Sequence, residues 1–126
     1  MDALLREANI VSLHVPLTSE TANLIDATRL ASMRPGAILI NTARGGLVDQ
    51  AALVEALRSG RLAGAGLDVF ESEPVRADDL LLRLDNVVVT PHVAWLTVGT
   101  LRRGLEIAVE NCRRLSAGET LLHRVV

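Results

Sequence analysis

Four short segments rich in apolar and β-branched residues recur along the chain, with helical patterns between them. The segments run from Asn9 to Val15, Gly36 to Asn41, Leu62 to Val69 and Asn86 to Thr90. Their apolar residues follow one another without the alternation of a half-solvated antiparallel strand, so each segment is predicted to be a fully buried strand. An irregular stretch is predicted only between the third and fourth strands, over Glu71 to Asp85.

Helical patterns lie before, between and after these strands. One is predicted over Asp2 to Ala8, and a second over Asp26 to Met33, which opens with an aspartate cap and is stopped by a proline. A third follows the cap residue Asp49 and ends at Gly60, and the longest runs from Val98 to Ala117. This order predicts right-handed crossovers and an α/β fold that is half of a doubly wound, Rossmann-like parallel sheet of about four strands with flanking helices.

The last predicted helix carries one apolar stripe along its length. Its stripe residues are Leu101, Leu105, Ala108, Val109, Cys112 and Leu115. A stripe of this spacing is typical of a helix that packs one face against a core. Cys112 is therefore predicted to be a core residue.

Length and charge exclude several classes of protein. The 126 residues suffice for one domain at most, and a net charge of −2 gives no basic surface for nucleic acid. A single cysteine rules out an internal disulfide, and no Cys/His cluster has the spacing of a metal site. No apolar run approaches the ~18 residues of a membrane span, and the charged N-terminus is unlike a signal peptide. We therefore predict a cytoplasmic protein without a metal, nucleic acid or membrane partner.

Polar side chains follow each predicted strand. The strands run into His14 to Thr18, Asn41 to Gly46, Asp68 to Pro74 and Thr90 to Trp95. An open parallel sheet binds its ligands beyond the carboxyl ends of its strands. An arginine, several carboxylates and two histidines are therefore expected along one edge of the sheet, which is the predicted site.

Three motifs in this chain resemble a known enzyme family. They are ILINTARGGLVD over Ile38 to Asp49, GAGLDVFESEP over Gly64 to Pro74, and NVVVTPHVAW over Asn86 to Trp95. In this order and spacing the chain resembles the D-isomer-specific 2-hydroxyacid dehydrogenases, which include phosphoglycerate dehydrogenase and glycerate dehydrogenase/hydroxypyruvate reductase. The resemblance extends from about Ala3 to Gly118. It implies an NAD(P)-dependent reduction of a 2-oxo acid to a D-2-hydroxy acid.

The resemblance also implies three catalytic residues. It places a substrate-binding arginine at Arg44, a carboxylate at Glu73 and an acid/base histidine at His92. Reduction of a 2-oxo acid requires a proton for the developing alkoxide, which suits a histidine. Glu73 would bind the other ring nitrogen, and the planar fork of Arg44 would hold the substrate carboxylate. Glu71 competes for the carboxylate role, but its position in the motif favours Glu73.

A nicotinamide cofactor, NAD or NADP, is implied at the same edge. Asp68 would lie near the nicotinamide carboxamide or ring nitrogen, and the alternative is that it merely caps the loop. The other residues implied on the cofactor side are His14, Val15, Pro16, Thr42, Ala43, Arg44, His92 and Ala94. The residue pair Ala94 and Trp95 resembles the glycerate dehydrogenase and hydroxypyruvate reductase branch. For the His14 side chain the alternative is a packing or loop-anchoring role, and for Arg44 it is a solvated turn.

One family feature is missing from the sequence. No Gly-x-Gly-x-x-Gly turn occurs, because Gly64 and Gly66 lie within a predicted strand. The chain is therefore interpreted as the C-terminal portion of an NAD(P)-binding domain, without the phosphate-binding turn and the substrate domain, and we expect it to bind the cofactor weakly or not at all by itself. Its first strand would be an exposed edge, which predicts a homo-oligomer or dependence on the missing segments. The alternative is a non-catalytic remnant or interaction module of the same fold.

Overall fold

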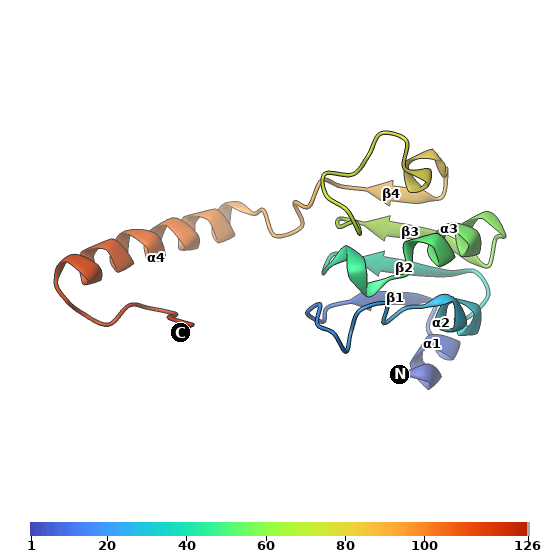
Figure 1. The fold of residues 1–126 in the computed structure, drawn as a ribbon, viewed down its shortest axis with the longest axis horizontal. Helices are drawn as coiled ribbons and strands as arrows, with labels where there is room; N and C mark the ends of the chain where they lie inside the picture. Colours follow the sequence, from blue (N-terminus) through green and yellow to red (C-terminus); the bar gives the residue numbers. More distant parts are fainter. Residues whose placement is uncertain (126) are drawn as a thin grey trace. The chain divides into compact units, whose positions relative to one another are not determined.

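Four parallel strands form one sheet in the order β1-β2-β3-β4 (Figure 1). The computed structural model describes residues 1–125, divided into two units between residues 93 and 94, and the sheet lies in the first unit. The strands are β1 Ile10–Leu13, β2 Ala37–Asn41, β3 Leu62–Leu67 and β4 Val87–Val89. The predicted parallel α/β sheet is confirmed, although each strand is shorter than predicted. The first predicted strand does lie at the edge of this sheet.

Three α-helices accompany the sheet in the same unit. They are α1 Asp2–Glu7, α2 Ala27–Ser32 and α3 Gln50–Arg58, with the short 3-10 helices η1 Gly45–Leu47 and η2 Leu80–Arg83. The predicted caps are present, because the carboxylates of Asp26 and Asp49 accept the backbone N–H groups of Arg29 and Ala52 at 2.8 and 3.0 Å. Helix η2 falls inside the stretch that was predicted to be irregular.

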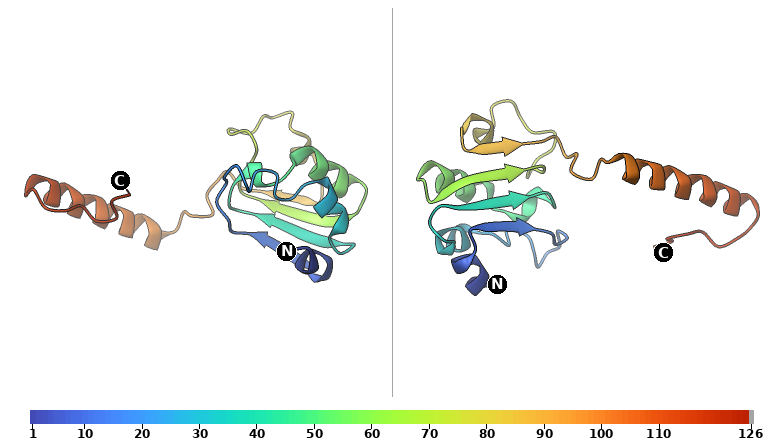
Figure 2. Two further views of the ribbon diagram at one scale, coloured as in Figure 1. Left: turned by 60° about the horizontal axis from the view of Figure 1, so that its bottom comes forward. Right: turned by 180° about the vertical axis from the view of Figure 1, so that it is seen from behind.

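The strands are buried on one face only, so the prediction of fully buried strands is wrong. Along β1, Ile10 is 61% exposed whereas Val11 is buried, and β2 and β3 show a similar alternation. Each connection advances by one strand in the same direction, which places α2 and α3 on the same face. Seen from behind, the strands lie in front of these helices (Figure 2). Ile38 and Val88 consequently remain 37% and 72% exposed.

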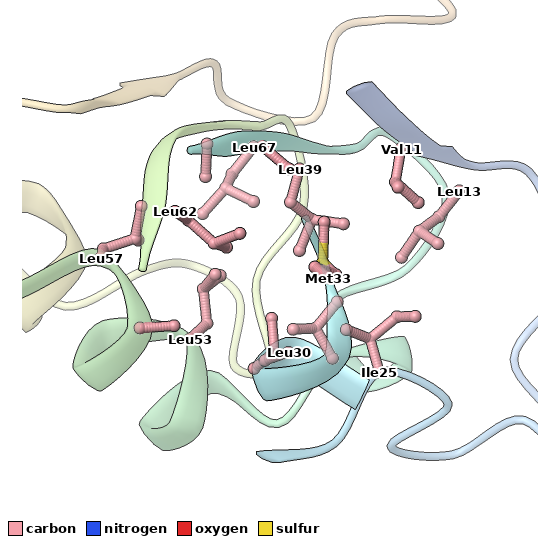
Figure 3. Packing of buried hydrophobic residues seen from close by; sticks show 14 of the residues in the cluster. Val11, Leu13, Ile25, Leu30, Met33, Leu39, Leu53, Leu57, Leu62 and Leu67 are labelled. Atoms are coloured by element: carbon pink, nitrogen blue, oxygen red, sulfur yellow. The ribbon is translucent and has the colours of Figure 1, made fainter. Parts of the chain in front are cut away.

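The core lies between the covered face of the sheet and the helices (Figure 3). Leu30 of α2 and Leu53 of α3 pack with Leu39 of β2 and Leu62 of β3, all of them almost completely buried. Each such side chain stabilises the fold by roughly 1.5–3 kcal/mol relative to an exposed one. This aliphatic layer supports the strands whose carboxyl ends carry the polar loops.

Helix α4, Val98–Ser116, is the regular element of the second unit. Thr97 caps the start of this helix, because its hydroxyl accepts the backbone N–H of Thr100 at 3.0 Å. No described residue of α4 is buried, and its stripe residues Leu105 and Val109 are 67% and 70% exposed. Cys112 is exposed as well, so its prediction as a core residue is wrong, because one helix and a short tail cannot enclose a stripe. None of the helices among the described residues is both long enough and apolar enough to cross a membrane.

Candidate active site

Three loops leave the carboxyl ends of β2, β3 and β4 side by side. Beyond the strands, the backbone N–H of Asp68 donates to the carbonyl of Asn41 at 3.0 Å, and that of Thr90 donates to Leu67 at 2.9 Å. These bonds continue the pairing of the sheet into the loops. The segments that carry Arg44, Glu73 and His92 therefore start from adjacent points on one edge, as the parallel topology requires.

Glu73 and His92 form a direct side-chain pair. Nδ1 of His92 lies 2.8 Å from Oε2 of Glu73, although 19 residues separate the two in sequence. The other carboxylate oxygen accepts the backbone N–H of Phe70 at 3.0 Å, which holds the carboxylate in place. A carboxylate only accepts hydrogen bonds, so the imidazole carries a proton on Nδ1. The ring is thereby oriented, with Nε2 on its opposite side.

The pKa of Glu73 is lowered from its ordinary value of 4.5. The largest cause is the hydrogen bond with His92, followed by the bond from the Phe70 N–H, while partial burial acts in the opposite direction. Electrostatic interactions with His92 and Arg44 lower it further. Glu73 is therefore ionised at neutral pH, and the guanidinium of Arg44 lies within electrostatic reach of the pair.

The backbone of His92 has an unusual conformation. Its φ angle is +56°, in the left-handed region, which costs a residue with a Cβ atom roughly 1–2 kcal/mol. Asp68 lies beneath this segment and is 2% exposed. One of its carboxylate oxygens accepts the Val93 N–H at 2.9 Å and the Thr90 hydroxyl. Asp68 is thus buried below the edge of the sheet, and its predicted contact with a cofactor stays a prediction.

The loop that carries Arg44 is held by hydrogen bonds to the Asn41 side chain and by a close backbone contact with the next loop. Asn41, which is 1% exposed, accepts the Ala43 N–H at 3.1 Å and donates to the Arg44 carbonyl at 2.9 Å. Gly45 abuts the next loop so closely that a Cβ atom there would lie 1.9 Å from the carbonyl carbon of Phe70. A glycine is therefore required for this approach of two backbones. Phe70 is the residue whose N–H holds Glu73, so the contact links the arginine and glutamate loops.

An open groove of about 610 Å³ lies beyond β1 and β2. Its lining residues are His14, Val15, Pro16, Leu17, Thr42, Ala43 and Arg44. Six of these were predicted on the cofactor side, so the structure gathers them at one place on the expected edge. The groove has the size of a cofactor site, and it combines apolar side chains with a hydroxyl and a guanidinium. These properties fit the nicotinamide end of a dinucleotide.

The remaining predicted residues lie as follows. Nε2 of His14 is 2.8 Å from the hydroxyl of Ser12, a contact that suits the loop-anchoring alternative. Ala94 is the first residue of the second unit, and Trp95 in that unit is 55% exposed. A smaller hollow of about 210 Å³ adjoins the histidine and glutamate. It is lined by Phe70, Glu73, Pro74, Val75, Pro91 and His92.

Comparison with known proteins decides the family of the chain. Residues 1–94 match the family model of the D-isomer specific 2-hydroxyacid dehydrogenase, NAD binding domain. The chain belongs to this family. The resemblance in the sequence is thus confirmed, and the Rossmann-like sheet is the NAD-binding fold of the D-2-hydroxyacid dehydrogenases.

Similar proteins of the family have curated names and solved structures. The glyoxylate reductase of Korarchaeum cryptofilum is 50% identical over 119 residues, which are 94% of this chain and 36% of that protein. The glycerate dehydrogenase of Methylorubrum extorquens is 44% identical over 94% of this chain and 38% of its own length. The D-lactate dehydrogenase of Lactobacillus jensenii, solved with NAD+, is 42% identical with a TM-score of 0.88, covering 99% of this chain and 41% of that one. The chain thus spans little more than a third of the curated relatives it matches.

Several contacts in this candidate site had not been singled out in the sequence. They involve the side chains of Asn41 and Thr90 and the backbone N–H groups of Phe70 and Val93. Asn41 offered one signal, because it is a polar residue that ends an otherwise apolar strand. Every residue except proline has a backbone N–H, so the sequence does not indicate which of them act as donors here, and only the structure shows it.

Proposed function

We propose that this chain carries the acid/base and substrate-binding residues of an NAD(P)-dependent dehydrogenase that reduces a 2-oxo acid to a D-2-hydroxy acid. The observation that supports the proposal best is the 2.8 Å contact between His92 and Glu73, with Arg44 within electrostatic reach of it. Glyoxylate and hydroxypyruvate are the substrates to test first, because the similar proteins include a glyoxylate reductase and a glycerate dehydrogenase.

Each of the three residues has a task in this reaction. The guanidinium of Arg44 binds the substrate carboxylate with its planar fork and draws electron density from the adjacent carbonyl. His92 holds a proton at Nε2 and gives it to the carbonyl oxygen as negative charge develops there. Glu73 accepts the Nδ1 hydrogen, which orients the ring so that Nε2 can face the substrate. A reduced nicotinamide, when bound, supplies the hydride.

The groove next to Arg44 provides the place for the cofactor. Thr42, Ala43 and the backbone from His14 to Pro16 line it. The hydroxyl of Thr42 and the backbone groups can hydrogen-bond a ribose, while Val15 and Pro16 give an apolar surface for a ring. The proposal includes either NAD or NADP, since these residues face the nicotinamide end and not the adenosine end.

The test is an assay of the full-length protein that follows the oxidation of NADH or NADPH with glyoxylate or hydroxypyruvate as substrate. We expect His92→Ala and Glu73→Gln to lower kcat by roughly 10²–10⁴-fold and to leave the Kd for NADH nearly unchanged. Glu71→Gln is the matched control, because Glu71 is an exposed carboxylate two residues from Glu73. Equal activity of wild type and His92→Ala would refute the acid/base role.

A calorimetric titration with NADH and NADPH separates this proposal from its rival. The rival is a non-catalytic module that retains the fold and binds another chain through its open sheet face, where Val88 is 72% exposed. Binding of a cofactor together with turnover supports the dehydrogenase. A well-folded protein that binds neither cofactor and oxidises neither supports the rival.

A further inference from the structure

Two polar side chains are buried among the described residues, and they lie at the carboxyl ends of adjacent strands. Asn41 ends β2 and Asp68 follows β3, with exposed fractions of 1% and 2%. The backbone N–H of Asp68 donates to the carbonyl of Asn41 at 3.0 Å, which joins them. Burial of a polar group is unfavourable unless it is hydrogen-bonded. The partners of these two side chains therefore indicate what each one holds.

Asp68 binds the chain on both sides of His92. Its oxygen Oδ1 accepts the Thr90 hydroxyl, two residues before the histidine, and the Val93 N–H at 2.9 Å, one residue after it. Between these points the His92 backbone adopts a φ of +56°. Such a conformation persists only where surrounding contacts fix it. The carboxylate supplies two such contacts from the rigid end of a central strand.

Asn41 binds the arginine loop in a comparable way. Its oxygen accepts the N–H of Ala43 at 3.1 Å, and its amide nitrogen donates to the carbonyl of Arg44 at 2.9 Å. Both bonds are made to backbone atoms of the loop. The direction in which the Arg44 side chain leaves the sheet is therefore set by a buried residue.

We propose that Asp68 and Asn41 are positioning residues: Asp68 holds His92 against Glu73 through Thr90 and Val93, and Asn41 holds Arg44. This inference rests on the proposed function, which assigns the chemistry to the three residues that are held. It adds a role that acts through the loop backbones and requires no contact with substrate or cofactor. A geometric error of 1 Å in such a site can lower a rate by about 10²-fold.

The kinetic test compares three variants of the protein at the length its gene encodes. Asp68→Ala removes both bonds, and we expect kcat to fall about 10²-fold. Asp68→Asn keeps an oxygen that can accept both bonds, so we expect its kcat to be at least about tenfold higher than that of Asp68→Ala. Thr90→Val removes one donor at constant volume and should lower kcat about fivefold. Thr28→Val, an exposed threonine in α2, is the matched control.

A second measurement does not depend on turnover. In the chain of 126 residues, amide hydrogen exchange reports the Val93 N–H, and nitrogen NMR reports the proton on His92 Nδ1. We expect Asp68→Ala to speed exchange at Val93 at least tenfold and to weaken the Nδ1 signal, whereas Asp68→Asn restores both. Thr90→Val keeps the readout available if Asp68→Ala does not fold. If wild type lacks turnover while these signals respond as expected, the proposed function fails and the positioning role stands.

Two results would overturn the positioning role. Asp68→Asn could be as slow as Asp68→Ala, which would show that the charge itself acts on the reaction. Alternatively, the Val93 and His92 signals could be the same in Asp68→Ala as in wild type. For Asn41, the variant Asn41→Asp removes the donor to the Arg44 carbonyl and should raise the KM for the 2-oxo acid about tenfold. An unchanged KM would remove Asn41 from the proposal.

Discussion

Replacing Gly45 by alanine tests whether the close approach of two backbones sets the geometry of the site. The added Cβ would lie 1.9 Å from the carbonyl carbon of Phe70, 2.0 Å from its oxygen and 2.4 Å from the nitrogen of Glu71. Ordinary contact begins at 3.4 Å, so the loops must separate by 3.4 − 1.9 = 1.5 Å. All three atoms belong to the backbone, so no rotamer change can relieve the overlap. The arginine loop would then move away from the segment that holds Glu73.

The expected effects of Gly45→Ala are large in both stability and rate. Overpacking of this kind lowers the free energy of unfolding by about 1–3 kcal/mol, and a displacement beyond 1 Å lowers kcat about 10²-fold. Urea denaturation and steady-state kinetics measure the two effects. Gly46→Ala is the control, because its Cβ would meet only the flexible end of Leu17, at 3.1 Å. If both variants unfold at the same urea concentration and have equal kcat, the contact at Gly45 does not constrain the site.

Four further predictions follow from the contacts of the first unit. The pKa of Glu73 is lowered, so its ionised carboxylate makes a small contribution to stability that is present above pH 4.5 and is lost as the pH falls through the folded pKa. The small difference in unfolding free energy between wild type and Glu73→Gln should therefore vanish in urea titrations at acid pH. The Arg61 guanidinium donates to two carbonyls at the end of α2, and Arg61→Met should lower the unfolding free energy by about 1–3 kcal/mol in urea, with Arg61→Lys restoring little. Asp49→Ala removes the cap of α3 and should lower it by about 1 kcal/mol, measured by thermal unfolding, whereas Asp49→Asn should not. The edge strand β1 exposes Ile10, so sedimentation at high micromolar concentration should show self-association that Ile10→Lys reduces; a purely monomeric wild type would contradict this.

The order of elements and their common edge could be predicted because local patterns determine them. The caps Asp26 and Asp49 mark helix starts by their own hydrogen bonds, and apolar runs of strand length mark the strands. Once the strands are parallel, their carboxyl ends must meet at one edge. The burial of each face could not be predicted in this way. Ile38 is apolar, which is compatible with burial, but it lies on the sheet face opposite α2 and α3. The direction of the crossovers decides which face of the sheet the helices cover.

Within the site too, some contacts could be predicted from the sequence and others could not. Motif resemblance led us to expect Glu73 beside His92, and the structure places them 2.8 Å apart, although their catalytic roles stay predictions. The approach of Gly45 to Phe70 had no signal of its own, because a glycine pair is equally compatible with a plain turn. The same holds for the N–H of Phe70, which any residue except proline would provide at that position. Contacts between backbones depend on how two loops leave neighbouring strands, and residue spacing does not encode that.

Two groups of residues in this site should affect the reaction rate and the unfolding free energy differently. Glu73 and His92 have side chains that are 35% and 39% exposed, and pairs so open to water contribute little to stability. Asn41, Asp68 and Gly45 are held by buried bonds or by a backbone contact, so changes there strain the fold as well as the site. Variants of the first group should therefore lose rate at nearly unchanged unfolding free energy, and most variants of the second should lose both. Asp68→Asn is the informative exception, since it keeps an oxygen that can accept both bonds and replaces the other oxygen by a neutral NH2 group.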